Sequence, residues 1–145
     1  MDRSADRRVT WQWLPVAVGF CSFVVPVVSG AAVVTVISPS SPLPSVLSAK
    51  GQVHQDAAAD LCDYLSRVTG RKIAPGRGAA VGAVTIHVGP DAFVLKHAPE
   101  IKELYADGFL LKHLAVDGKQ HVVLSGIRLK SSRWAVEEFL MQFAG

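Results

Sequence analysis

Apolar side chains recur at helical spacing in the stretch that follows residue 55. They are three and four positions apart, whereas the acidic residues between them fall on other faces of the same helix. Asp56 suits the first turn of this helix, and Gly70 suits its end. The pattern predicts a helix over residues 56–69 with an apolar stripe of Ala58, Leu61, Cys62, Leu65 and Val68.

The C-terminal stretch, residues 131–145, shows the same periodicity with a broader apolar face. Glu137 and Glu138 lie on the polar side of the predicted helix. One side of this helix can cover a sheet, and the remaining apolar surface favours contact with a second body. We therefore take Trp134, Phe139 and Phe143 as a candidate partner interface. Ala135 belongs to the same stripe, which Val136 and Leu140 widen.

Short runs of β-forming residues between the two helices predict strands. Asp117-Gly118 is a strong hairpin signal, because such a turn requires positive φ angles, so the runs on either side of it should pair antiparallel. Asp91 suits the cap of a short helix, and Pro99 the first turn of another. The predicted strands are 46–49, 84–88, 109–116 and 121–127, with 33–37 as a more strand-like alternative to the first.

The N-terminus combines basic residues with an apolar run. Arg3, Arg7 and Arg8 precede the run, and the small residues Ser29-Gly30-Ala31 resemble a signal-peptidase site. We interpret residues 1–31 as a signal peptide, which places the protein in the periplasm, the cell envelope or the medium. The alternative is an uncleaved membrane anchor, because residues 33–37 extend the apolar run to about 24 residues.

The serine- and proline-rich sequence SPSSPLPS, residues 38–45, is typical of a linker. We therefore divide the chain into a signal segment at 1–31, a linker at 32–45 and a folded domain at 46–145. The full chain has 145 residues, fewer than the roughly 250 of a complete sugar-cleaving barrel.

The composition and charge argue against some classes of function. Half of the residues are hydrophobic, and the formal net charge is +3. Removal of residues 1–31 takes away three of 15 basic and two of 12 acidic residues and leaves a charge of +2. No basic stripe interleaved with aromatic residues is visible, so we expect no nucleic-acid partner. Cys62 would then be the only cysteine, and its place in an apolar stripe predicts an unreactive core residue.

The residues that carry chemistry form no catalytic or metal-binding motif. Glu100 and Glu103 lie one turn apart beside Lys102, and no histidine pair has the helical spacing of zinc ligands. Gly76, Gly78 and Gly82 precede a strand, which is the wrong order for a phosphate-binding loop. We predict no catalytic residue, metal or cofactor. The best constellation is the set His87, His113 and His121, which would approach one another if their strands are adjacent.

Five segments in order resemble a known domain. They are AAADLCDYLSRVTGRKI at 57–73, VTIHVGP at 84–90, DGFLLKHL at 107–114, HVVLSG at 121–126 and RWAVEEFLMQFAG at 133–145. Together they resemble the small N-terminal α/β domain that precedes the catalytic barrel in bacterial alpha-glucuronidases, beta-hexosaminidases and related glycoside hydrolases. The likeness spans about residues 45–145. One departure is Ser131-Ser132, where members of the family usually carry Gly-Thr.

The resemblance implies an α/β (α+β) fold with a small, mostly antiparallel sheet and two main helices packed on one face. In that family the domain is not catalytic and packs against the barrel. We therefore expect a non-catalytic accessory domain of an exported carbohydrate-degrading glycoside hydrolase, in a truncated or stand-alone copy that is not an enzyme by itself. The alternative is an independent envelope module that binds saccharide or protein. The accessory interpretation requires that Trp134 and Phe143 are not wholly enclosed within the domain.

Overall fold

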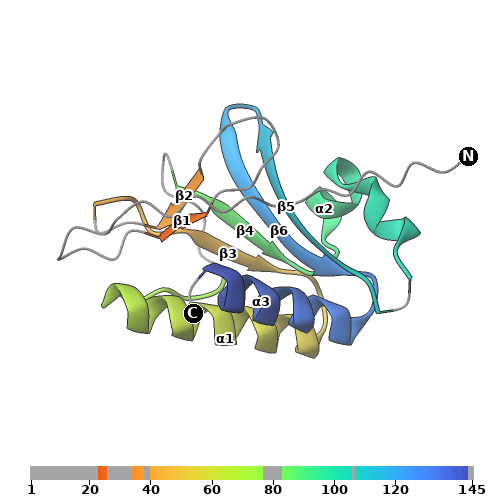
Figure 1. Ribbon diagram of the computed structural model, residues 1–145, viewed down its shortest axis with the longest axis horizontal. Coiled ribbons are helices and arrows are strands. Elements are labelled where there is room, and N and C mark those ends of the chain that lie inside the picture. The colour runs from red at the N-terminus through yellow and green to blue at the C-terminus, as the bar shows by residue number, and fades with distance from the viewer. Residues whose placement is uncertain (1–22, 26–33, 38–39, 77–82, 106, 144–145) are drawn as a thin grey trace, which may run out of the picture.

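The computed structural model describes residues 23–25, 34–37, 40–76, 83–105 and 107–143. Its centre is a four-stranded sheet with the order β3-β4-β6-β5. A separate antiparallel pair, β1 and β2, lies beside it (Figure 1). The strands are β1 (Phe23–Val25), β2 (Val34–Ile37), β3 (Ser45–Ser48), β4 (Thr85–Val88), β5 (Phe109–Val116) and β6 (Lys119–Gly126).

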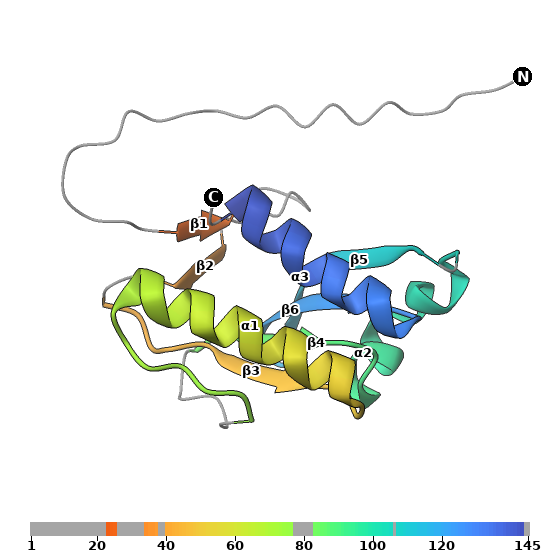
Figure 2. The same ribbon diagram turned by 90° about the horizontal axis from the view of Figure 1, so that it is seen from below.

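Two long helices cover one face of the sheet, as predicted. They are α1 (Gln52–Thr69) and α3 (Leu129–Phe143), and they lie side by side in Figure 2. The short helix α2 (Ala92–His97) and the 3-10 helix η1 (Pro99–Glu103) lie toward the other face (Figure 1). The mixed α+β class that the sequence predicts is therefore confirmed.

The strand directions differ from the expected mostly antiparallel sheet. β3 pairs with β4 in parallel, and β4 pairs with β6 in parallel, so only β5 and β6 are antiparallel. The connection through α1 explains the β3–β4 pair, because a helix returns the chain to the starting edge and makes the next strand parallel to the first. β4 and β6 are not consecutive, since α2, η1 and β5 lie between them. Among the described strands of this sheet, parallel pairs therefore outnumber the antiparallel one.

The hairpin between β5 and β6 confirms its sequence signal. Asp117 and Gly118 have φ angles of 51° and 73°, so both central residues adopt the positive φ that a two-residue turn of this kind requires. The pairing places Leu111 opposite Leu124 and Leu114 opposite His121. The second strand begins at Lys119, two residues earlier than predicted.

Helix α1 is longer than predicted at its start and ends where expected. It begins at Gln52 after Gly51 and stops at Gly70, which has the left-handed conformation of a helix end. The extra turn contains His54, which is buried. Helix α3 begins at Leu129, two residues earlier than predicted, so Ser131 and Ser132 lie inside its first turn.

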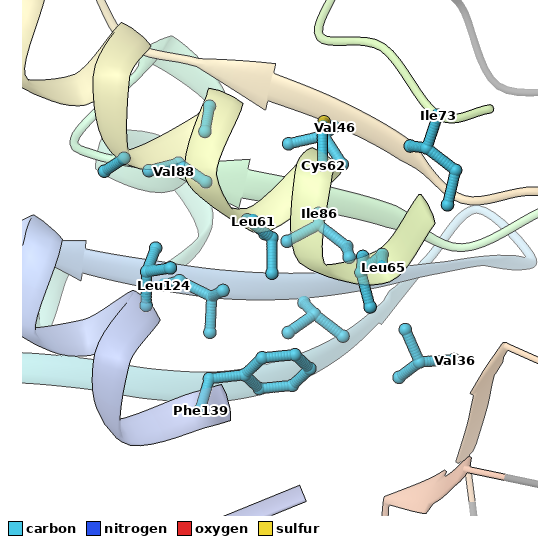
Figure 3. Packing of buried hydrophobic residues seen from close by; sticks show 14 of the residues in the cluster. Val36, Val46, Leu61, Cys62, Leu65, Ile73, Ile86, Val88, Leu124 and Phe139 are labelled. Atoms are coloured by element: carbon cyan, nitrogen blue, oxygen red, sulfur yellow. The ribbon is translucent and has the colours of Figure 1, made fainter. Parts of the chain in front are cut away.

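The main core lies between the sheet and the two long helices. Figure 3 shows side chains from α1, α3 and the strands converging there, among them Leu61, Ile86 and Phe139. Val36 and Ile37 of β2 also belong to this core and are almost fully buried. β2 falls on the alternative strand predicted at 33–37, and these two residues of the predicted 32–45 segment pack in the core. Of the predicted signal segment, only Phe23–Val25 lies within the described residues.

A second, smaller apolar cluster joins α2 and η1 to the opposite face of the sheet. Its buried members are Val94, Ala98, Ile101 and Val123. Because successive strand residues point to opposite faces, Val123 lies on this side of β6 while Val122 and Leu124 enter the main core. The same alternation decides where the histidines lie.

Candidate functional site

The three candidate interface residues on α3 have different environments. Trp134 is 39% exposed, whereas Phe139 is 3% exposed and belongs to the main core. Phe139 is therefore not available to a partner, because its side chain fills the space between α3 and the sheet. The side chain of Phe143 lies outside the described part of the structure. Met141, which the sequence did not single out, is 68% exposed.

Trp134 and Met141 share one face of α3. Residues seven apart lie two turns apart on the same side of a helix. Ala135, Val136 and Phe139 are buried on the other side. The two large apolar side chains therefore lie on the side of α3 turned away from the sheet, and neither belongs to the core of the domain.

The register of the sheet brings two of the three predicted histidines together. Thr85 of β4 pairs with His121 of β6, and His87 pairs with Val123. His87 and His121 are therefore diagonal neighbours on one face, and His87 Nε2 lies 3.1 Å from His121 Nδ1. Their exposed fractions are only 3% and 8%.

His113 does not join them. It pairs with Val122, whose side chain enters the main core, so its side chain lies on the opposite face of the sheet. There His113 Nε2 contacts the side-chain oxygen of Gln120. The prediction that three histidines gather is thus confirmed for two and wrong for the third.

Asp91 extends the histidine pair into a chain of three groups. Its Oδ2 lies 2.6 Å from His87 Nδ1, and its Oδ1 accepts the backbone N–H of Val94 at 2.8 Å. The second bond caps α2, as the sequence predicts. The first was missed, although a Gly-Pro turn directly after a strand, as in Gly89-Pro90, is the signal that folds Asp91 back toward His87. We call Asp91, His87 and His121 the relay.

Phe93 covers the relay with its ring. Its centroid lies 4.4 Å from that of His87, nearly parallel at 10°, and 4.2 Å from that of His121. His97 contacts the same ring at 4.6 Å. The segment from the end of β4 to the end of α2 therefore supplies the carboxylate of Asp91, the covering ring of Phe93 and the third imidazole, His97.

The hydrogen-bond pattern fixes where protons lie when both imidazoles are neutral. His87 donates its Nδ1–H to Asp91, which leaves its Nε2 to accept from His121 Nδ1–H. His121 Nε2 then carries a lone pair. Among the described residues, two buried side-chain nitrogen or oxygen atoms have no hydrogen-bond partner, His54 Nδ1 and Ser125 Oγ. His121 Nε2 has no partner among the described residues either, and since it is not one of these buried atoms, it reaches solvent.

The surroundings lower the pKa values of two groups of the relay, Asp91 and His121. Burial opposes charge on Asp91, yet the hydrogen bonds from His87 and Val94 outweigh it, so the pKa of Asp91 lies below its usual value. Burial lowers the pKa of His121, and the neighbouring His87, His97 and Lys119 lower it further. Asp117 acts on His121 in the opposite direction. Both shifts favour the deprotonated forms of Asp91 and His121.

His54 is a separate buried imidazole at the start of α1. Its Nδ1 has no hydrogen-bond partner, and a Cβ on Gly89 would lie 2.7 Å from that atom. Gly89 has a φ of 87°, so this position excludes a side chain by both conformation and space. Burial lowers the pKa of His54. The ring thus serves as a neutral packing group.

Other candidate chemistry is limited within the described ranges. No group of three or more His, Cys, Asp or Glu residues there is arranged to hold a metal ion. Cys62 is buried in the main core, and burial raises the pKa of its thiol to about 11, which makes it unreactive.

Gly78 and Gly82 lie outside the described residues. Of the helices that the structure describes, none has the length and apolar content needed to cross a membrane.

Comparison with known proteins adds no assignment. No protein-family model matches the chain, and no curated protein matches it.

Proposed function

We propose that the protein is a non-catalytic accessory domain of an exported carbohydrate-degrading glycoside hydrolase, and that α3 packs against the catalytic barrel of that enzyme. The observation that carries the proposal is the exposed pair Trp134 and Met141 on the outward side of α3. Large apolar side chains at the centre of a contact contribute most of the affinity in protein interfaces. The two helices on one face of the sheet agree with the fold that the resemblance implies, whereas the mostly parallel strand directions differ from it.

The carboxylates support the non-catalytic part of the proposal. A glycosidase needs a general acid whose pKa is raised. Asp91 and Glu100 instead have lowered pKa values: burial opposes charge on Asp91 but its hydrogen bonds outweigh this, and Lys112 bonds the Glu100 carboxylate. Asp60, Asp63 and Glu137 contact arginine side chains on the surface of α1 and α3. The lowered pKa values of Asp91 and Glu100 favour the charged form, the opposite of what a general acid requires.

The test is binding to a barrel of the alpha-glucuronidase type from which the N-terminal domain has been deleted. We expect a one-to-one complex in analytical ultracentrifugation. Replacing both apolar residues by lysine, Trp134→Lys with Met141→Lys, should weaken it at least about thirtyfold, the effect of losing a hot spot. The matched control is Leu95→Lys, which changes an equally exposed apolar residue on α2, and it should leave the affinity unchanged.

Two outcomes would overturn the proposal. One is the absence of any complex at a concentration of about 100 μM, far above the Kd of a specific complex, while circular dichroism shows a folded protein. The other is an equal loss of binding in the Leu95→Lys control.

Saccharide binding is a second candidate, because Tyr105 is 92% exposed in the segment after η1. A single exposed ring can stack on a sugar face. Polysaccharide pull-down that depends on Tyr105 and not on Trp134 would assign this function instead. Pull-down that is unchanged by Tyr105→Ala would remove it.

A further inference from the structure

Asp91 connects the relay to the start of α2. One carboxylate oxygen receives the His87 N–H from the sheet, and the other receives the Val94 N–H from the helix. Phe93, in the same turn, lies on both imidazole rings. Asp91 and Phe93 therefore link α2 to both His87 and His121.

A count of protons shows how this connection responds to acid. With no added proton, the chain runs from Asp91 through His87 to His121 with each N–H facing an acceptor. One added proton preserves every bond, because either imidazole can carry it while the other still offers an acceptor nitrogen. Two added protons place an N–H on both His87 Nε2 and His121 Nδ1, and these two atoms are 3.1 Å apart. The bond between the rings is then replaced by repulsion between two donors and two positive charges.

We propose that the relay is a proton-operated latch that holds α2 and η1 on the sheet and releases them when both imidazoles are protonated. The released segment is short. Helix α2 has six residues and η1 has five, so neither is stable in water without its contacts to the sheet. The face left behind is the apolar cluster around Val123, Leu110 and Leu114.

Neighbouring charges destabilise the closed state once it carries two added protons. His97 on α2 contacts Phe93, and Lys119 begins β6, the strand of His121. Both carry positive charge in acid and oppose a second proton in the relay, while Asp117 in the hairpin turn partly offsets them. On the flanking strands, the residues opposite the two histidines are uncharged: Leu47 on β3 faces His87, and Leu114 on β5 faces His121. On the same face of β5, Lys112 is paired with Glu100 of η1.

The test is hydrogen exchange on the full chain, expressed as protection factors so that the intrinsic pH dependence cancels. The reporters are the amides of Val94, Leu95 and Ala98, all of which are hydrogen-bonded in the closed state. Their protection should fall about tenfold per pH unit for each proton taken up on opening, between about pH 6.5 and pH 4.5. Amides of α1 should lose clearly less protection than those of α2 over the same range.

Three variants identify the titrating groups. His121→Gln removes one of the two protons that open the latch, so α2 should stay protected in acid. His113→Gln, on the opposite face of the sheet, should leave the drop unchanged, whereas His97→Gln should keep the drop but move its midpoint, because His97 lowers the pKa of His121. A parallel loss of protection in α1 and α2, or an unchanged α2, would overturn the proposal.

A second measurement decides the matter if His121→Gln does not fold. Imidazole nitrogen chemical shifts of the wild-type chain should show His87 and His121 titrating in two coupled steps, with the second step at lower pH. Two independent single-step titrations would contradict the latch.

Discussion

Two buried serines show that equal burial need not mean equal importance. Ser125 and Ser132 are both fully buried. Ser132 Oγ accepts the Gly126 N–H at 3.0 Å and lies 3.2 Å from the Gly126 carbonyl, so it connects the end of β6 to the start of α3. Ser125 Oγ has no hydrogen-bond partner. Only the Ser132 hydroxyl forms hydrogen bonds that replace those with water lost on folding.

Alanine substitutions should therefore separate the two serines. Ser132→Ala leaves the buried Gly126 N–H without an acceptor and should lower the free energy of unfolding by about 2 kcal/mol. Ser125→Ala removes an unsatisfied hydroxyl and should be neutral or slightly stabilising. Urea unfolding followed by circular dichroism measures both. Equal losses in the two variants would contradict the assigned hydrogen bonds.

At the scale of elements, α2 depends on one residue more than on its own length. A helix of six residues has little stability of its own, and Asp91 both caps it and connects it to His87. By contrast, α1 has 18 residues and no side-chain cap at its start. Its apolar stripe packs on the sheet and makes a cap less necessary.

Removing the Asp91 carboxylate should show this dependence. Asp91→Ala loses the cap and the bond to His87, and we expect a cost of about 2 kcal/mol with the largest loss of amide protection in α2. The control is Asp63→Ala, which removes an exposed carboxylate paired with Arg67 on α1 and should cost less than about 0.5 kcal/mol. Urea unfolding and hydrogen exchange of both variants provide the measurement. An exchange pattern unchanged in α2 would refute the assigned role.

The sequence predicts elements better than their partners. The stripe from Ala58 to Val68 and the Asp117-Gly118 turn are local signals, and both elements are present as expected. The parallel pairing of β4 with β6 joins segments more than thirty residues apart, and no local pattern encodes it. The contact between His87 and His121 could not be predicted for the same reason. Its approach depends on which strands are neighbours and on the parity that sends His113 to the other face.

Core membership at the N-terminal side was missed for a related reason. Val36 and Ile37 precede a serine- and proline-rich tract, and that composition favours a linker. Their burial follows from long-range packing against the helices and strands of the core, which local composition does not report. Likewise, the surplus apolar face of α3 was predicted, but Phe139 proved to be a core residue and Met141 an exposed one.

At the scale of the whole molecule, stability should decrease in acid in two stages. Burial lowers the pKa of both His54 and His121 from 6.5, so the unfolded chain binds more protons than the folded one below that pH. Their contribution is fully present above pH 6.5 and is lost as the pH falls further. Asp91 and Glu100 also have lowered pKa values, so their contributions are lost later, below about 4.

Urea unfolding at a series of pH values tests this order. The free energy of unfolding should fall from about pH 7 to pH 5 and fall again below about pH 4. His54→Gln should flatten part of the first stage, because it removes one of the two titrating groups. A free energy that rises on acidification to pH 5 would show that these imidazoles are not neutral in the folded protein.

The β4–β6 pair has a consequence for how the chain folds. β3, α1 and β4 form one unit of two parallel strands with a helix between them, and β5, β6 and α3 form another, a hairpin followed by a helix. The hairpin joins segments close in sequence and forms fast, whereas the β3–β4 and β4–β6 pairs each join residues more than thirty positions apart, so β4 meets β6 only when the two units dock, after the hairpin has formed. His87 belongs to the first unit and His121 to the second. The imidazole pair therefore forms only once docking has occurred, and its nitrogen signals would time that late step in refolding.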